Sequence, residues 1–235
     1  ILINLNDYKN LRVLVTGSTG FKGSWLCYWL NNLGAKVYGI GLRPEKNFYL
    51  FNQLKLSNKI NQFILDISNF RKLNQIVKKI KPDIIFHLAA QSVVSDSILQ
   101  PIKTINTNVL GSANILEVVK RNKINSLVYI TSDKCYLNNN TKKNFKEKDQ
   151  LGGVDIYSSS KASAEIIFYS YHQSYYRNYS KLSIASARAG NVIGGGDFSK
   201  YRILPDYFRS LLEGKKLILR SSKSIRPWQH VMDPL

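Results

Sequence analysis

The stretch LRVLVTGSTGFKG, residues 11–23, decides the fold. A short aliphatic run enters a turn that contains Gly17, Gly20 and Gly23, and a helical pattern follows from about Phe21. Glycines at this spacing let the backbone approach a pyrophosphate, and the exposed N–H groups and dipole of a helix N-terminus favour its charge. The stretch therefore predicts a strand, a phosphate-binding turn and a helix. The alternative is a plain strand-to-helix turn, which rarely needs three glycines at this spacing.

Short aliphatic runs alternate with longer amphipathic segments along the rest of the chain. This is the pattern of a parallel sheet covered by helices, so we expect an α/β fold with a doubly wound parallel sheet. Further strands are expected at 36–40, 62–65, 83–88, 127–131 and 182–187. Helices are expected near 21–33, 69–79, 101–121, 158–175 and 205–213.

The chain changes character after about Ala189, where a glycine run is followed by fewer regular elements. We divide it into a dinucleotide-binding domain with the catalytic residues, 1–188, and the interleaved start of a substrate-binding lobe, 189–235. The polar, Lys- and Asn-rich segment 137–153 is interpreted as a surface loop.

The net charge of +19 raises the question of a nucleic-acid partner. The lysines are scattered over every segment, and no basic helix, zinc finger or stacking-aromatic motif gathers them. We therefore expect no nucleic-acid site, and we interpret the charge as a coding bias that still attracts an anionic substrate.

Composition bounds the remaining classes. With 235 residues, 44% of them apolar and 21% charged, the chain fits an ordinary globular protein. No stretch approaches the roughly 20 apolar residues of a membrane span. Cys27 and Cys135 lack metal-ligand spacing, so we expect no metal and a reducing, cytoplasmic location. No signal peptide is visible, although a chain that starts at Ile1 leaves a targeting segment open.

Recognition of an adenosine is harder to assign. An acidic residue for the ribose is expected at the end of the second strand, but that strand runs into Gly41, Leu42 and Arg43. Arg43 would suit a 2′-phosphate, so the residues alone leave NAD and NADP open. Asp66 is a candidate for contact with the adenine, and its alternative is a place near a helix N-cap, where Ser68 is the better cap.

The sequence YSSSK, residues 157–161, lies at the head of a predicted helix. Tyr157 and Lys161 are four residues apart and share a helix face. A nearby ammonium favours the phenolate, so we expect the pKa of Tyr157 to fall from about 10 and the side chain to act as a base. The alternative is an ordinary Tyr–Lys pair in a basic protein; the glycine turn favours the catalytic interpretation.

The sequence TSDKCY, residues 131–136, follows a predicted strand at the sheet edge where active sites gather. Ser132 can bind a substrate hydroxyl, Asp133 can protonate a leaving hydroxyl, and Lys134 can assist proton removal. The alternative is a solvated Asp-Lys turn. Cys135 is more typical of strand filler than of a nucleophile, because no His lies near it in the sequence.

The sequence FHLAAQ, residues 86–91, follows another strand. We interpret His87 as an interior histidine whose hydrogen bonds are satisfied. The small Ala89-Ala90 step leaves room for a flat cofactor.

Taken together, the glycine turn, the H-L-A-A step, the T-S-D strand end and the Y-x-x-x-K pair resemble the extended short-chain dehydrogenases, specifically their nucleotide-sugar dehydratases. Dehydratases of this family usually have Asp-Glu where this chain has Asp133-Lys134, and the Asp-Lys form is similar to the CDP-glucose branch. The strings TGFKGSWL (19–26), RAGNVIGGGD (188–197) and RPWQHV (226–231) are similar to it as well. The resemblance covers essentially the whole chain. Because family members continue beyond this length, we expect a truncated substrate lobe.

The resemblance implies a Rossmann fold, bound NAD and an internal redox cycle on CDP-glucose. Hydride leaves the sugar C4, water is lost across C5 and C6, and hydride returns to C6. The product is a CDP-4-keto-6-deoxy sugar for deoxysugar and lipopolysaccharide synthesis. The alternatives are another nucleotide-sugar dehydratase, a 4-epimerase on the same fold, and a non-catalytic nucleotide-binding domain. Asp133 argues against the epimerase, which needs no acid for a C6 hydroxyl.

The same resemblance assigns residues to roles and implies a homo-oligomer that neither binds nucleic acid nor enters a membrane. The expected catalytic residues are Ser132, Asp133, Lys134, Tyr157 and Lys161. The expected cofactor-binding residues are Gly17, Gly20, Phe21, Lys22, Gly23, Asp66, Ile67, Leu88, Ala89, Ala90, Gln91, Thr131, Tyr157 and Lys161. The expected substrate-binding residues are Gln91, Ser132, Asn191, Arg202 and Arg226, with each Arg suited to a diphosphate by its bidentate fork.

Overall fold

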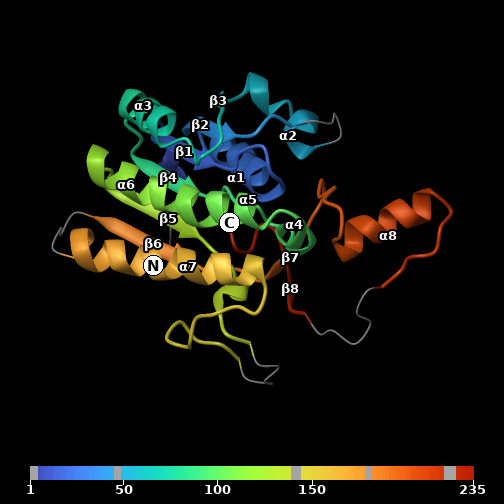
Figure 1. The fold of residues 1–235 in the computed structure, drawn as a ribbon. Helices are drawn as coiled ribbons and strands as arrows, with labels where there is room; N and C mark the ends of the chain where they lie inside the picture. The colour runs from blue at the N-terminus through green and yellow to red at the C-terminus, as the bar shows by residue number, and fades with distance from the viewer. Residues whose placement is uncertain (1–4, 45–48, 139–143, 178–181, 220–225) are drawn as a thin grey trace.

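A six-stranded parallel sheet forms the centre of the molecule in the computed structural model, which describes residues 5–44, 49–138, 144–177, 182–219 and 226–235 (Figure 1). The strand order is β3-β2-β1-β4-β5-β6. The order reverses between β1 and β4, and this places a switch point at their carboxyl ends. The predicted doubly wound α/β fold is confirmed. The strands are β1 (Arg12–Thr16), β2 (Lys36–Gly41), β3 (Asn61–Ile64), β4 (Ile84–His87), β5 (Ser126–Ile130) and β6 (Ser183–Ala187).

Strand β1 shows why its sequence is apolar throughout. Leu14 packs into the core on one face of the sheet, while Val13 and Val15 pack into the core on the other. All three are fully buried, as expected for a central parallel strand that is covered on both faces.

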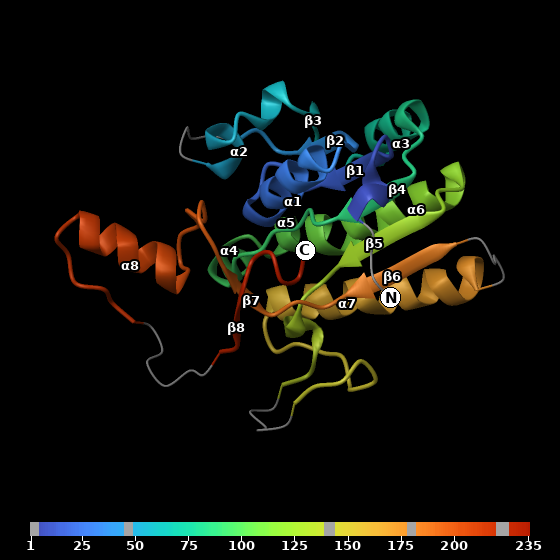
Figure 2. The same cartoon turned by 180° about the vertical axis from the view of Figure 1, so that it is seen from behind.

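Helices form a layer on each face of the sheet (Figure 2). The layer with α1 (Phe21–Asn32) and α2 (Leu50–Gln53) packs against Val13 and Val15. The opposite layer packs against Leu14 and its neighbours. That layer contains α3 (Phe70–Ile80), α6 (Ser112–Asn122) and α7 (Ile156–Tyr171), and α4 (Val94–Leu99) and α5 (Pro101–Ile105) pack beside α7.

The single helix expected at 101–121 is divided by a π-helical turn, η3 (Asn106–Gly111). Asn108 lies in this turn and is buried, and its side chain bonds both the N–H and the carbonyl of Gln91. It also donates to the hydroxyl of Ser160 at 2.9 Å. These bonds give a local cause for the widened turn, which periodicity alone did not reveal. The helix expected at 158–175 likewise changes to a π-helical turn, η5 (His172–Tyr176), after α7.

The N-terminus of α3 corrects one prediction. Asn69 is the cap residue, because its side chain accepts a hydrogen bond from the N–H of Lys72 at 3.1 Å. Ser68 does not cap the helix; its N–H instead donates to the carboxylate of Asp66 at 2.9 Å. Asp66 therefore stabilises the turn before the helix.

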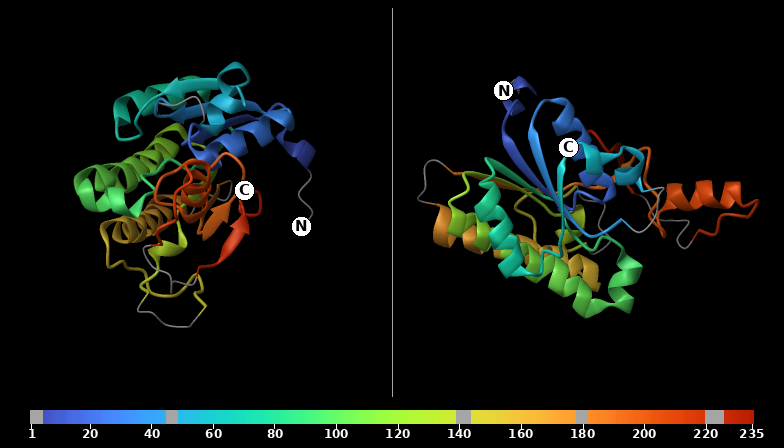
Figure 3. Two further views of the ribbon diagram at one scale, coloured as in Figure 1. Left: turned by 90° about the vertical axis from the view of Figure 1, so that its right-hand side faces the viewer. Right: turned by 90° about the horizontal axis from the view of Figure 1, so that it is seen from above.

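The described part of residues 189–235 is built from few elements: β7 (Asn191–Ile193), α8 (Ile203–Leu212) and β8 (Trp228–His230). β7 and β8 pair in parallel, and neither was expected from the sequence. Helix α8 stands clear of the sheet in two perpendicular views (Figures 1 and 3) and has no buried side chain. The division into two domains stays a prediction.

Two further features concern the segments between elements. Tyr136 bridges Leu151, and the N–H of Leu137 donates to the carbonyl of Gln150, so the described ends of the loop 137–153 lie together; residues 139–143 are outside the described part. Short 3₁₀ turns lie at η1 (Leu5–Tyr8), η2 (Leu56–Asn58) and η4 (Asp133–Cys135). Within the described ranges, every helix is too short or too polar to cross a bilayer.

Candidate active site

A cleft of about 1050 Å³ runs along the carboxyl ends of the parallel strands. One wall comes from the ends of β1, β3, β4 and β5 and the start of α7, and the other comes from residues within 189–230. The structure brings nearly all the predicted site residues into this cleft. Those that line it are Gly17, Gly20, Phe21, Lys22, Gly23, Asp66, Ile67, Leu88, Ala89, Ala90, Thr131, Ser132, Asp133, Lys134, Tyr157, Lys161, Asn191, Arg202 and Arg226.

The glycine turn fits a dinucleotide because side chains are excluded from it. A Cβ on Gly23 would lie 2.0 Å from the carbonyl oxygen of Gly17. Gly17 has a φ of +75°, and a Cβ there would lie 2.8 Å from the N atom of Ala89. Gly20 precedes α1 without a side-chain cap, so the first N–H groups of α1 remain available to a phosphate.

The end of β2 lies close to the glycine turn. Gly41 occupies that position, and a Cβ there would lie 2.5 Å from the hydroxyl oxygen of Thr19. Leu42 lines the cleft, whereas Arg43 is exposed and is not among the lining residues. Asp66 lines the cleft while accepting a hydrogen bond from the N–H of Ser68, and its contact with the adenine stays a prediction.

Gln91 is a predicted site residue that the structure does not place among the lining residues. Its side-chain nitrogen donates to the carbonyl of Val93 at 2.8 Å, which turns the amide toward its own loop. Ser92, which the sequence did not single out, lines the cleft in its place. The role of Gln91 in binding cofactor and substrate stays a prediction.

Tyr157 and Lys161 lie together on α7, and both are buried. The ammonium of Lys161 lies 5.9 Å from the centroid of the Tyr157 ring. The expected fall in the pKa of Tyr157 is wrong for this structure: burial raises it, and the opposing effects of Ser132 and Arg202 are smaller. The physical reason is that burial penalises the phenolate more than the nearby charges stabilise it.

The pKa of Lys161 is lowered to about 8, chiefly by burial and further by the positive charge of Lys22. Burial also lowers the pKa of Lys22, as does the nearby Arg202, while Asp133 raises it. The side chain of Lys22 therefore interacts electrostatically with Lys161, Arg202 and Asp133, in addition to the place of its backbone in the glycine turn.

His87 is an interior residue, as predicted. It lies beneath the site with its Nδ1 2.7 Å from the hydroxyl of Thr16 and its Nε2 2.9 Å from that of Ser112. Burial lowers its pKa to about 3, so the ring is neutral at physiological pH.

The turn η4 presents the T-S-D-K residues. The hydroxyl of Ser132 donates to the carboxylate of Asp133 at 3.0 Å and accepts from the N–H of Lys134 at 3.2 Å. Cys135 lies in this turn and not in a strand, which corrects the expected placement. It is buried, and burial raises the pKa of its thiol to about 12, so it does not act as a nucleophile.

The second wall carries three of the five predicted substrate residues, Asn191, Arg202 and Arg226. Arg202 pairs with Asp197 at 3.0 Å, and its other nitrogen donates to the hydroxyl of Ser92 at 3.2 Å. The indole of Trp25 donates to the carbonyl of Gly195 at 3.0 Å and links this wall to α1. Asp197 was missed in the sequence, and no local signal marks it as a partner of Arg202.

Comparison with known proteins agrees with this geometry. The GDP-mannose 4,6 dehydratase family matches residues 14–235. CDP-glucose 4,6-dehydratase of Salmonella typhimurium is 44% identical over 100% of this chain and 67% of its own length. The chain belongs to this family of nucleotide-sugar dehydratases. A further dehydratase, the dTDP-D-glucose 4,6-dehydratase of Dictyostelium discoideum, is 29% identical over 98% of this chain and 55% of its own length.

Solved structures of dehydratases and epimerases share the fold. The dTDP-glucose 4,6-dehydratase of Bacillus anthracis in complex with NAD has a TM-score of 0.79 at 28% identity, over 95% of this chain and 68% of that one. The UDP-N-acetylglucosamine 4-epimerase of Methanobrevibacter ruminantium has a TM-score of 0.80 at 27% identity, over 95% of this chain and 70% of that one. The fold of this chain is thus shared by dehydratases and epimerases.

Proposed function

We propose that this dehydratase chain carries the catalytic machinery of a CDP-glucose 4,6-dehydratase, a lyase that converts CDP-glucose to CDP-4-keto-6-deoxyglucose. The observation that carries the proposal is the Ser132-Asp133-Lys134 turn, which lies in the same cleft as Tyr157 and Lys161. A 4-epimerase needs the Tyr–Lys pair, but it has no need for an adjacent acid that expels a hydroxyl.

The first half of the reaction is an oxidation at the sugar C4. NAD⁺, when bound, supplies the acceptor for the C4 hydride and returns that hydride to C6. Tyr157 removes the proton of the C4 hydroxyl, and the ammonium of Lys161 stabilises the phenolate. The C4 ketone that results makes the proton on C5 acidic.

The second half is the loss of water. Lys134 removes the proton from C5, and Asp133 donates a proton to the C6 hydroxyl, which leaves as water. Ser132, bonded to Asp133 at 3.0 Å, orients that carboxyl group. C6 then gains the returned hydride and C5 regains a proton, so the sugar has lost one water with no net oxidation.

The lining residues fit NAD. The glycine turn accommodates a pyrophosphate, and the Ala89-Ala90 step borders the cleft as room for a flat ring. We propose NAD and not NADP, because the hydride is returned within each turnover and Arg43 is not among the lining residues. Calorimetric titration is expected to show tighter binding of NAD⁺ than of NADP⁺; the reverse preference would contradict the choice of cofactor.

For the substrate we propose that Asn191, Arg202 and Arg226 hold the nucleotide diphosphate or the sugar. Both arginines line the cleft that Tyr157 lines, and Arg binds diphosphate oxygens bidentately. We place the start of the substrate lobe at residue 189.

The setting of the enzyme follows from the same proposal. Two buried free thiols, Cys27 and Cys135, fit the cytoplasm, and the product would enter deoxysugar and lipopolysaccharide synthesis. We also propose a homo-oligomer. The support is a set of apolar side chains that are exposed on α5 and α7, namely Ile102, Ile166 and Tyr169, and sedimentation equilibrium tests it.

We propose that the net charge of +19 does not mark a nucleic-acid site. Binding to duplex DNA should therefore be weak and should be lost at physiological salt.

The experiment that tests the function incubates the protein, at the full length that its gene encodes, with CDP-glucose and NAD⁺. The expected product has lost one water, has a ketone at C4 and carries deuterium at C5 when the solvent is D₂O. With Asp133→Asn, oxidation at C4 should continue while water loss slows by about a hundredfold or more, so reduced nicotinamide accumulates as absorbance. A product with inverted C4 and an intact C6 hydroxyl would instead establish the epimerase.

A further inference from the structure

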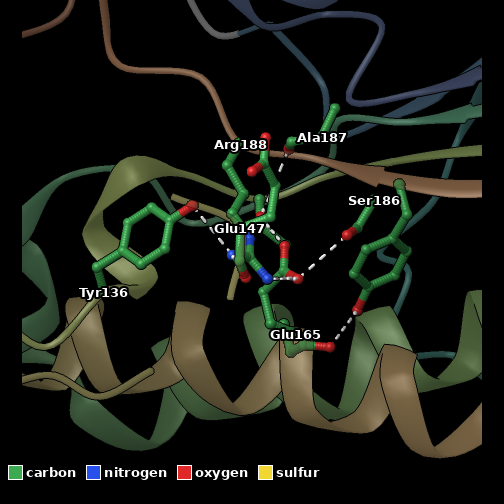
Figure 4. Close-up of polar contacts among 9 residues, drawn as sticks. Tyr136, Glu147, Glu165, Ser186, Ala187 and Arg188 are labelled. Atoms are coloured by element: carbon green, nitrogen blue, oxygen red, sulfur yellow. Dashed lines mark hydrogen bonds and ion pairs between the residues drawn. The ribbon is translucent and has the colours of Figure 1, made fainter. Parts of the chain in front are cut away.

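A buried carboxylate outside the cleft joins the catalytic segments (Figure 4). Glu165 lies on α7 and is 3% exposed. One of its oxygens pairs with Arg188 at 2.7 Å and accepts from the hydroxyl of Ser186 at 3.1 Å. Its other oxygen accepts a short hydrogen bond from the hydroxyl of Thr131. Burying a charge this deeply is costly unless the charge is paired and hydrogen-bonded, as it is here.

The partners of Glu165 lead directly to the acid-bearing turn. Thr131 immediately precedes Ser132 and Asp133, and its N–H donates to the carbonyl of Ala187 at 2.9 Å. The N–H of Asp133 donates to the carbonyl of Ala189 at 3.2 Å. The turn that carries the acid is therefore held to α7 through the bond from Thr131, and to the chain that leaves β6 through main-chain bonds.

Arg188 extends the network to the second wall of the cleft. It directly precedes residue 189, and it donates to the hydroxyl of Tyr136 and to the carbonyl of Glu147, each at 3.0 Å. Burial would lower the pKa of Arg188, but its bonds to Glu165 and Tyr136 outweigh this and raise it, so the guanidinium stays charged. Its planar head also lies over the ring of Tyr136, 5.0 Å from the centroid.

Position along α7 relates Glu165 to the base. Tyr157, Lys161 and Glu165 follow at intervals of four residues and so share one helix face. The charged and titratable groups that act on Lys161 come from several elements: Lys22 of α1, His87 of β4, Cys135 of η4 and Glu165 of α7 itself. Of these, Lys22 disfavours the ammonium, while Cys135 and Glu165 favour it.

We propose that Glu165 is a positioning residue that fixes the Tyr157–Lys161 pair on α7 against the acid-bearing turn, acting through Thr131 and Arg188. The proposal rests on the proposed dehydratase function. Glu165 does not line the cleft, so it touches neither substrate nor cofactor. Its carboxylate holds the base and the acid at a fixed separation and offsets part of the positive charge around Lys161. A neutral side chain of the same shape keeps the packing but loses the charge.

The test compares Glu165→Gln with Glu165→Asp. Misplacing a base relative to an acid acts on the transition state, so Glu165→Gln is expected to lower kcat roughly tenfold to a hundredfold, with KM for CDP-glucose within about twofold of wild type. Loss of the carboxylate also lowers the pKa of Lys161, so the break that this ammonium gives in the kcat profile near pH 8 should move to lower pH. Glu165→Asp restores the charge and should return the break toward its wild-type position.

Glu117→Gln is the matched control. Glu117 pairs with Lys120 at 2.8 Å and Arg121 at 2.7 Å, and it accepts from the hydroxyl of Tyr171 on α7 at 3.3 Å, yet it has no bond to the acid-bearing turn. The control should leave kcat and its pH profile unchanged. A folded Glu165→Gln protein with wild-type kcat and an unmoved break near pH 8 would overturn the proposal, as would an equal loss in the control.

Two further measurements separate other kinds of failure. If Glu165→Gln does not fold, Glu165→Gln/Arg188→Gln removes both charges of the ion pair and must give the same shift of the break. If the wild-type protein does not convert CDP-glucose, the proposed function is refuted, but the role of Glu165 can still be tested without an activity assay. In that case, NMR of ¹³Cε-labelled lysine, assigned with Lys161→Arg, must show Lys161 titrating at lower pH in Glu165→Gln than in wild type; equal midpoints would refute the role.

Discussion

The wall of the cleft formed by the sheet and the wall formed by residues 189–230 are held in different ways. Thr131, Tyr157 and Lys161 are at most 8% exposed and are fixed by β5, α7 and the cores beneath them. On the other wall, Arg226 is exposed and α8 buries no side chain. The groups proposed to break bonds are therefore placed by a packed scaffold, whereas the groups proposed to bind substrate depend on a few anchors such as Trp25–Gly195 and Arg202–Asp197.

The largest effect is expected on the packed wall. Tyr157→Phe removes the proposed base and leaves the ring, so CDP-glucose turnover should fall by about a hundredfold or more while the protein stays folded. Stopped-flow absorbance should show no reduced nicotinamide after substrate is added. Reduction at the wild-type rate would assign the base to another group.

The core beneath that wall provides the second prediction. Leu127 is fully buried in β5, so Leu127→Ala should lower the free energy of unfolding by about 2–5 kcal/mol. Urea denaturation followed by circular dichroism measures this. A loss below about 1 kcal/mol would mean that the scaffold is less tightly packed than its burial indicates.

The sparsely anchored wall should respond in binding. Arg202→Met removes a guanidinium that is proposed to contact the diphosphate and leaves Asp197 unpaired. KM for CDP-glucose should rise roughly tenfold to a hundredfold, as expected for one charged hydrogen-bonding group, with a smaller change in kcat. A fall in kcat at constant KM would move Arg202 from the binding wall to the chemistry.

The pH dependence tests the charges of the packed wall. Burial raises the pKa of Tyr157, so its base form grows as pH rises; the pKa of Lys161 is lowered to about 8, so its ammonium is lost above that pH. Because the pKa of Tyr157 lies above that of Lys161, the active pair of phenolate and ammonium should grow as pH rises to about 8 and then stay level until Tyr157 itself ionises, with both breaks belonging to the coupled pair. Lys161→Arg, whose charge persists, should lack the break near pH 8 and keep rising; a break retained there would assign it to another group.

The smallest effect is expected on α8. Leu211→Ala makes the same chemical change as Leu127→Ala, but Leu211 is 62% exposed. The free energy of unfolding should change by no more than about 0.5 kcal/mol. A loss comparable to that of Leu127→Ala would show that α8 is packed in solution and would remove the contrast between the walls.

The fold could be predicted from the sequence because its signals are local. The aliphatic runs located each strand of the main sheet to within about two residues, and the glycine turn located the start of α1. The broken helix at Asn106–Gly111 could not be predicted, because Asn108 forms its bonds with Gln91 and Ser160, which are distant in the sequence. The β7–β8 pair was missed for the same reason: its partners, near residues 191 and 228, meet only in the folded chain.

For the site, the sequence by itself determined which residue types were present and at which strand and helix ends they lie, because backbone periodicity and glycine spacing are written in neighbouring residues. Only the tertiary structure decided their electrostatics. Four-residue spacing predicted an acidified Tyr157, but burial raises its pKa instead, and burial depends on the whole fold. The structure also decided that Glu165 joins Thr131 and Arg188, since these residues come from different elements and their pairing is visible only once the strands have assembled.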